Sequence, residues 1–191
     1  MPPLEAILER LVTYASRCQP TLRGHLQPGL SPAEVRARLA HAGFPYQPAR
    51  EVATLYAWHN GTAGHNLLET FFNYHFFLPL EDALRDYTLL QRHDLYLVDR
   101  LPLFTFEGEY YVVQCGETEV EEAPVYHDYH STDYAYDSLT RMLAAELACY
   151  ETGAYRLEGG KYLRDEAQMA VLKLQWNPGR GPAGLAPYDH P

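Results

Sequence analysis

The chain has 191 residues and a formal net charge of −10, and 47% of its residues are hydrophobic. This length suits one domain with a buried core, and the composition is unlike that of disordered chains. The acidic balance argues against nucleic-acid binding, because proteins that bind nucleic acids need a basic footprint on their surface.

Two helices are predicted at the start of the chain. Apolar residues recur at helical spacing from Leu4, and this helix is expected to end near Cys18. After a loop rich in Gly and Pro, the sequence Ser31-Pro32-Ala33-Glu34 forms a capping box with Pro at the first helical position. The second helix should therefore begin there and stop at Gly43.

A third helix carries Trp58 and is predicted to end at Asn60–Gly61. Its apolar stripe stops there, and glycine suits the left-handed conformation that commonly ends a helix. We therefore expect a positive φ at Gly61 and a cost on the order of 1 kcal/mol for Gly61→Ala. Pro79 is expected to open a fourth helix.

Strands are expected in the middle of the chain. Residues 101–106 and 110–113 are rich in aromatic and β-branched side chains, and they flank the turn Glu107-Gly108-Glu109. This pattern predicts a β-hairpin. Residues 125–129 and 134–136 are two further predicted strands.

Two final helices are expected, one from the cap Asp137–Ser138 to Gly153 and one beginning at Asp165. Helices followed by strands and again by helices predict an α+β fold with a largely antiparallel sheet, packed with helices on one side. We expect a single domain over residues 1–178 and a Gly/Pro-rich tail over residues 179–191. The core between helices and sheet is predicted to contain Trp58, Leu84, Phe104, Phe106, Leu139 and Leu143.

The cysteine pattern and the absence of long apolar runs bear on the cellular compartment of the protein. Cys18, Cys115 and Cys149 are odd in number and far apart, which argues against a disulfide framework and a paired-cysteine zinc site. No run approaches the roughly 18 apolar residues of a membrane span, and the N-terminus lacks the pattern of a secretory signal. We expect a cytoplasmic protein without a membrane partner.

Histidines are candidates for metal ligands, but their spacing does not favour a site. His127 and His130 lie at an odd offset on a predicted strand, so they should face opposite sides. His59, His65 and His75 flank one loop and match no zinc signature. We therefore expect no metal ligand and no cofactor.

No catalytic residue is expected either. Motifs of serine nucleophiles are missing, and the acidic neighbours of Cys115 should raise its pKa and discourage the thiolate. A small hydrolase or metal-dependent enzyme that uses the scattered His, Asp and Glu residues is kept as the alternative.

An acidic segment is the most informative feature of the composition. Between Arg100 and Arg141 there is no Lys or Arg but there are nine acidic residues, a negative field that pairing within the segment cannot cancel. A solvated surface would explain it, and so would a surface that binds a basic protein. For the second interpretation the expected partner-binding residues are Glu107, Glu109, Glu117, Glu119, Glu121, Glu122, Asp128, Tyr129 and Asp133.

Five segments, in this order, are similar to motifs of one family. The first is the capped helix at Ser31-Pro32 leading to Gly43-Phe44-Pro45, and the last is Pro124-Val125-Tyr126 with Ser138-Leu139. Leu55-Tyr56-Ala57-Trp58-His59-Asn60-Gly61 resembles a helix ending in His-Asn-Gly, and Phe77-Leu78-Pro79-Leu80-Glu81 resembles an aromatic, Leu, Pro, Leu, Glu segment. Residues 103–111 resemble a hairpin with an acidic turn and an aromatic second strand. These are motifs of the SUKH superfamily, the Smi/Knr-type domain, and the resemblance covers about residues 30–155.

The resemblance implies a SUKH-like α+β fold and, in bacteria, an immunity protein that binds and neutralises a toxin. Fungal members act as scaffolds in cell-wall signalling, which gives a further alternative. We therefore expect a non-enzymatic protein-binding module, an immunity protein in the first place, whose partner is a basic protein such as a nuclease-like toxin domain.

Overall fold

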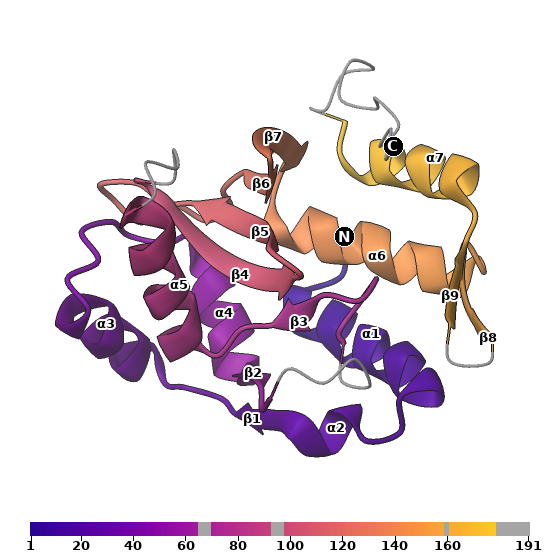
Figure 1. Ribbon diagram of the computed structural model, residues 1–191, viewed down its shortest axis with the longest axis horizontal. Coiled ribbons are helices and arrows are strands. Elements are labelled where there is room, and N and C mark those ends of the chain that lie inside the picture. Colours follow the sequence, from indigo (N-terminus) through magenta and orange to yellow (C-terminus); the bar gives the residue numbers. More distant parts are fainter. Residues whose placement is uncertain (65–69, 93–97, 159–160, 179–191) are drawn as a thin grey trace.

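An antiparallel sheet of five strands, in the order β3-β4-β5-β6-β7, lies at the centre of the protein (Figure 1). The computed structural model describes residues 1–64, 70–92, 98–158 and 161–178. The strands of the sheet are β3 (Phe76–Phe77), β4 (Arg100–Phe106), β5 (Glu109–Gln114), β6 (Val125–Tyr129) and β7 (Ser131–Tyr136). The predicted hairpin is β4–β5, and the two further predicted strands are β6 and β7.

Helices surround this sheet. They are α1 (Leu4–Cys18), α2 (Leu22–His25), α3 (Pro32–His41), α4 (Arg50–Trp58), α5 (Leu80–Arg92), α6 (Leu139–Glu151) and α7 (Glu166–Trp176). Two small sheets are made by β1 (Leu26–Pro28) with β2 (His59–Thr62) and by β8 (Tyr155–Glu158) with β9 (Lys161–Arg164). The α+β class with a largely antiparallel sheet is confirmed, whereas the tail predicted over residues 179–191 lies outside the described residues. Among the described helices, none has the length and apolar character needed to cross a membrane.

Side-chain caps fix the beginnings of three helices. Ser31 accepts a hydrogen bond from the backbone N–H of Glu34 at 3.3 Å, and Glu34 accepts one from the backbone N–H of Ser31 at 2.7 Å. This capping box, followed by Pro32, starts α3 as predicted. Ser138 caps α6 and Asp165 caps α7 in the same way, each through a hydrogen bond from a backbone N–H of the first turn.

Gly61 has the predicted positive φ of +75° but a different place in the fold. Helix α4 ends at Trp58, its C-cap is His59 in extended conformation, and Gly61 lies in β2. The predicted C-cap role is therefore wrong, because the chain passes directly from helix to strand. Packing also requires the glycine, since an added Cβ would lie 2.2 Å from the backbone nitrogen of Pro79.

Asn60, the residue before this glycine, caps the next helix. Its Oδ1 accepts a hydrogen bond at 2.9 Å from the backbone N–H of Leu80, the first residue of α5, where helical N–H groups lack partners within the helix. Its Nδ2 donates to Glu81 at 3.3 Å. The Asn–Gly pair therefore joins the end of α4 to the beginning of α5.

Most of the predicted core is confirmed. Buried in one cluster are Leu84, Phe104, Leu139 and Leu143, and Trp58 packs against them half-buried. Phe106 is not part of this cluster, and its ring stacks on Tyr74 with centroids 5.4 Å apart. It was wrongly predicted because it is the last residue of β4, beside the turn, where the strand leaves the core.

Helices contact both faces of the sheet, a departure from the expected arrangement on one side. The Tyr110 hydroxyl lies 3.5 Å from Asp86 of α5. The next residue, Tyr111, points to the opposite face. There its ring lies 6.0 Å from that of Tyr136, which donates a hydrogen bond to Glu146 of α6 at 2.8 Å. Helices α5 and α6 therefore lie over opposite faces of β5.

Glu146 connects α6 to the elements around it. Its buried carboxylate accepts hydrogen bonds from Tyr136 at 2.8 Å and Tyr155 at 2.6 Å. The ammonium group of Lys173 in α7 lies 3.5 Å from the same carboxylate. A buried charge is tolerated when it is paired and hydrogen-bonded, and these contacts supply both.

Glu51 joins α4 to α6 and to the loop after β5. Its buried carboxylate accepts hydrogen bonds from the backbone N–H groups of Leu139 at 3.0 Å, Thr140 at 2.8 Å and Ala123 at 3.1 Å. The first two belong to the first turn of α6, where N–H groups have no partner within the helix. Burial raises the pKa of Glu51, while these hydrogen bonds act in the opposite direction.

Candidate functional site

The loop between β5 and β6 carries four of the predicted partner-binding residues, all of them exposed: Glu117, Glu119, Glu121 and Glu122. We call residues 117–122 the acidic loop. Its backbone is bound to the N-terminal end of α4, since the N–H of Arg50 donates to the carbonyl of Val120 at 2.9 Å. The adjacent Gln47 and Gly116 exchange backbone hydrogen bonds at 2.7 and 3.0 Å. The carboxylates are therefore presented on a fixed backbone.

Arg50 neutralises part of the charge of the acidic loop. Its Nε donates to Glu119 at 2.6 Å, and a second guanidinium nitrogen donates to Glu121. The hydrogen bond to Glu119 is the main cause of the raised pKa of Arg50. Glu117 and Glu122 have no ion pair with another described residue. The negative field is thus weaker than the sequence predicted, because a cation from outside the segment reaches it.

An open groove of about 490 Å³ lies beside the acidic loop, between α1, α3 and α4. Two acids and two arginines supply charges to its lining, and Trp58 supplies an aromatic surface; the charged residues are Glu5, Arg36, Arg50 and Glu119. The groove is in the size range of sites that accept a side chain or a small ligand. The acidic loop therefore borders a concave surface, to which Glu119 contributes.

The remaining predicted partner-binding residues lie elsewhere. Glu107 is in the β4–β5 turn, and Asp128, Tyr129 and Asp133 belong to the β6–β7 hairpin. Antiparallel pairing puts both turns at the end of the sheet opposite the acidic loop. At about 3.3 Å per residue, β5 separates the two ends by roughly 20 Å. The predicted partner-binding residues therefore form two groups at opposite ends of the sheet, and their role in binding stays a prediction.

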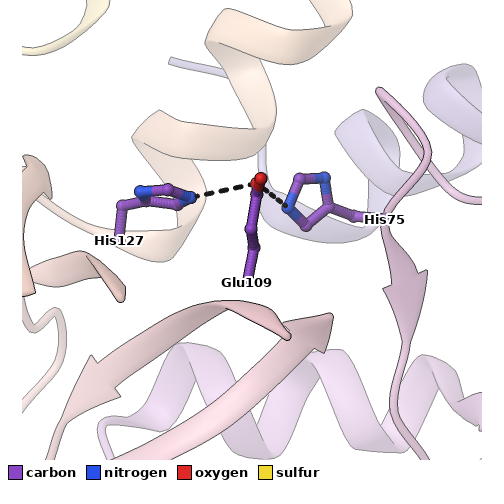
Figure 2. A group of neighbouring side chains, drawn as sticks. All are labelled: His75, Glu109 and His127. Carbon is purple, nitrogen blue, oxygen red and sulfur yellow. Dashed lines mark hydrogen bonds and ion pairs between the residues drawn. The ribbon is translucent and has the colours of Figure 1, made fainter. Parts of the chain in front are cut away.

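Glu109, the ninth of these residues, turns toward two histidines. His127 Nε2 lies 3.4 Å and His75 Nε2 lies 3.8 Å from Glu109 Oε2. Figure 2 shows the two imidazole rings on either side of the carboxylate. We call His75, Glu109 and His127 the trio, and one ligand atom from each lies within 4.8 Å of the others.

Sheet register and a tight turn assemble the trio. Glu109 and Tyr111 share one face of β5, and Tyr111 pairs with His127 of β6. His75 precedes β3, and its ring lies 4.8 Å from that of Tyr111, which in turn lies 5.0 Å from that of His127. The side chains of His75 and His127 are 3% and 7% exposed and that of Glu109 is 22% exposed, so the trio reaches solvent on the glutamate side.

Burial disfavours the charged form of both histidines. It lowers the pKa of His75 to about 3. Burial also lowers the pKa of His127, although the nearby Glu109 acts in the opposite direction. Neutral imidazole is the form that binds metal ions. Of the residues that the structure describes, the trio is the group of His, Cys, Asp and Glu side chains able to hold a metal ion.

The other histidine predictions have mixed outcomes. His127 and His130 diverge as expected, because His130 is exposed in the β6–β7 turn. His59 contacts the carbonyl oxygen of Gln27 at 2.8 Å, and His65 lies outside the described residues. The sequence interpretation missed the meeting of His75 with Glu109 and His127. Pairing the predicted strands would have brought the last two together, but His75 gave no local signal.

No protein-family model matches the chain, and no curated protein matches it. The described residues themselves offer two features with chemical potential. The acidic loop beside its groove can attract and position cationic groups. The trio combines the nitrogen and oxygen ligands that transition-metal ions use in proteins.

Proposed function

We propose that this protein is a non-enzymatic protein-binding module whose acidic loop and adjoining groove recognise a basic protein. In line with the SUKH resemblance, the module acts in the cytoplasm as an immunity protein that neutralises a toxin domain. The observation that carries the proposal is the acidic loop itself, four exposed carboxylates on an anchored backbone beside a groove.

Preorganisation supports this choice of surface. The backbone hydrogen bonds to Val120 and Gly116 hold the loop before a partner arrives, so little conformational entropy is lost on binding. Val120 is 45% exposed between the carboxylates and offers an apolar contact. Glu117 and Glu122 are exposed without ion pairs among the described residues and can pair with Lys or Arg of a partner.

The test begins with a search for a toxin gene beside this gene and continues with co-expression of the two proteins. The wild-type protein is expected to restore growth and to bind the purified toxin domain. Glu117→Lys combined with Glu122→Lys should weaken binding at least about tenfold, because two attractive contacts become repulsive. These side chains are exposed, so folding should be unaffected, which circular dichroism checks.

A charge-matched control lies at the opposite end of the sheet. Glu107→Lys combined with Asp133→Lys changes the net charge by the same amount, and both side chains are exposed. This pair should keep growth rescue and nearly wild-type affinity. Equal losses in both double variants would mean that only net charge matters, and no loss in either would refute the acidic loop as the binding surface.

A metal-dependent enzyme is the second candidate, because the trio supplies the histidines and the acid that this alternative needs. An enzyme requires turnover as well as binding. A hydrolytic activity that depends on added metal and disappears in Glu109→Gln would favour this candidate over the binding module.

A further inference from the structure

We propose that His75, Glu109 and His127 bind a divalent transition-metal ion, with zinc as the best fit. The sequence predicted no metal ligand, and the inference rests on the geometry that the fold creates. Imidazole nitrogens and one carboxylate oxygen suit zinc and its neighbours among the transition metals and are a poor match to calcium or magnesium. The inference concerns binding of the ion alone and does not depend on the proposed partner.

The decisive observation is the orientation of His75. Its Nδ1 lies 3.0 Å from the carbonyl oxygen of Asn73. A carbonyl can only accept, so Nδ1 carries the proton and Nε2 carries a lone pair. This buried Nε2 has no hydrogen-bond partner among the described residues and faces the carboxylate of Glu109 at 3.8 Å. Two acceptors that face each other repel unless a proton or a metal ion lies between them, and a second imidazole nitrogen, that of His127, 3.4 Å from the same carboxylate oxygen, favours the metal ion.

The two residues before His75 have an unusual backbone conformation, which orients the His75 ring. Asn73 and Tyr74 have φ values of 41° and 67°, a left-handed conformation that residues with a bulky side chain such as Tyr74 rarely adopt. Strain of this kind is retained where the surrounding structure requires it, often at a functional site. Here it places the Asn73 carbonyl against Nδ1, the outer contact that usually orients a metal-binding histidine.

The distances need little adjustment. Bonds of about 2.0–2.2 Å from zinc to nitrogen and oxygen put two tetrahedral ligands about 3.3 Å apart. The two contacts of Glu109 Oε2 with the imidazoles are 3.4 and 3.8 Å, and all three ligand atoms lie within 4.8 Å. Glu109 is partly exposed, so its side chain can close on the ion, and the two imidazole nitrogens, which lie within 4.8 Å of each other, also have to move closer.

Charges around the trio are compatible with an added cation. Lys173 is close enough to lower the pKa of both histidines, but its ammonium group pairs with the buried Glu146 at 3.5 Å. Glu109 supplies the negative charge within the site. Its solvent-facing side leaves room for a water molecule as the fourth ligand, the arrangement of zinc sites with three protein ligands.

The test is a titration of the full chain, freed of metal by a chelator, with zinc chloride in a calorimeter. One zinc ion per chain is expected, together with a rise in melting temperature, because an ion that binds only the folded state stabilises it. Glu109→Gln and His127→Gln should each weaken zinc binding at least about tenfold. Magnesium should not bind measurably to the wild-type protein or to either variant.

The matched controls are Glu107→Gln and His130→Gln, exposed residues two and three positions from the ligands. Both should keep wild-type zinc affinity and melting shift. Glu109→Gln keeps the shape of a partly exposed side chain, so the test survives if the buried His127→Gln variant fails to fold. Absence of zinc binding, or wild-type affinity in Glu109→Gln, would overturn the proposal. None of these variants lies in the acidic loop, so the outcome is separate from that of the partner experiment.

Discussion

Gly61 is a residue at which backbone conformation and packing act together. Its φ is +75°, and an added Cβ would lie 2.2 Å from Pro79 N and 2.6 Å from Leu78 C. Gly61→Ala should therefore lower the free energy of unfolding by at least about 3 kcal/mol, more than the left-handed conformation alone would cost. Gly153 is the control, because it has a φ of +78° but open space around its Cα. Gly153→Ala should cost about 1 kcal/mol, and equal losses in urea unfolding of the two variants would contradict the steric explanation.

Cys115 should be an unreactive thiol. It is 3% exposed, and burial raises its pKa to about 12, with a smaller contribution from Asp99. At pH 8 roughly one molecule in ten thousand would then carry the thiolate, which is the nucleophile. Peptide mass spectrometry after iodoacetamide treatment should show almost no alkylation of Cys115 in the native protein and complete alkylation in urea. Fast alkylation of the native thiol would revive a nucleophilic role.

At the scale of elements, Glu51 connects α4 with α6 through hydrogen bonds to the first turn of α6. Glu51→Gln would replace one acceptor oxygen by an NH₂ group that faces backbone donors, leaving buried N–H groups unsatisfied. The expected loss of stability is about 2–4 kcal/mol. Ser31→Ala, which removes the ordinary cap of α3, should cost about 1 kcal/mol by comparison. Chemical denaturation measures both, and a smaller loss for Glu51→Gln than for Ser31→Ala would show that the connection is weak.

Helix α6 should also depend on its buried face. Leu143 is fully buried, so Leu143→Ala should destabilise the protein by about 2–5 kcal/mol through lost burial and the cavity left behind. Val171 of α7 is 65% exposed, and Val171→Ala should change stability by no more than about 0.5 kcal/mol. Thermal and urea unfolding of the two variants compare the buried with the exposed position directly.

At the scale of the whole molecule, charge should govern the speed of partner binding. With a net charge of −10 and exposed carboxylates on the acidic loop, association with a basic toxin domain should slow steeply with salt. The screening length falls from about 10 Å at 0.1 M salt to about 3 Å at 1 M. Stopped-flow association rates should show this fall, and Glu117→Lys with Glu122→Lys should flatten it. Rates that ignore salt would mean that the acids serve solubility alone.

Local elements were predictable from the sequence, because their causes lie within a few residues. The capping box at Ser31, the caps Ser138 and Asp165 and the β4–β5 hairpin around Gly108 were each predicted and confirmed. Helix α2 and the strands β1, β2, β3, β8 and β9 were not predicted. They are short, and β1 pairs with β2 only because Leu26 meets Thr62 from far along the chain. Strands this short have too few residues to show the alternation of apolar and polar side chains that predicts a strand.

The sequence by itself determined the α+β class, the acidic balance and the beginnings of most helices, since periodicity, capping and charge are properties of neighbouring residues. Tertiary structure alone decided which of these residues act together. Sheet pairing sent Glu107 and Glu122, close in sequence, to opposite ends of β5, and the packing of the acidic loop on α4 gave Glu119 a partner in Arg50. The same pairing brought His75 to His127, because the register of an antiparallel sheet and the alternation of its side chains depend on contacts between distant segments.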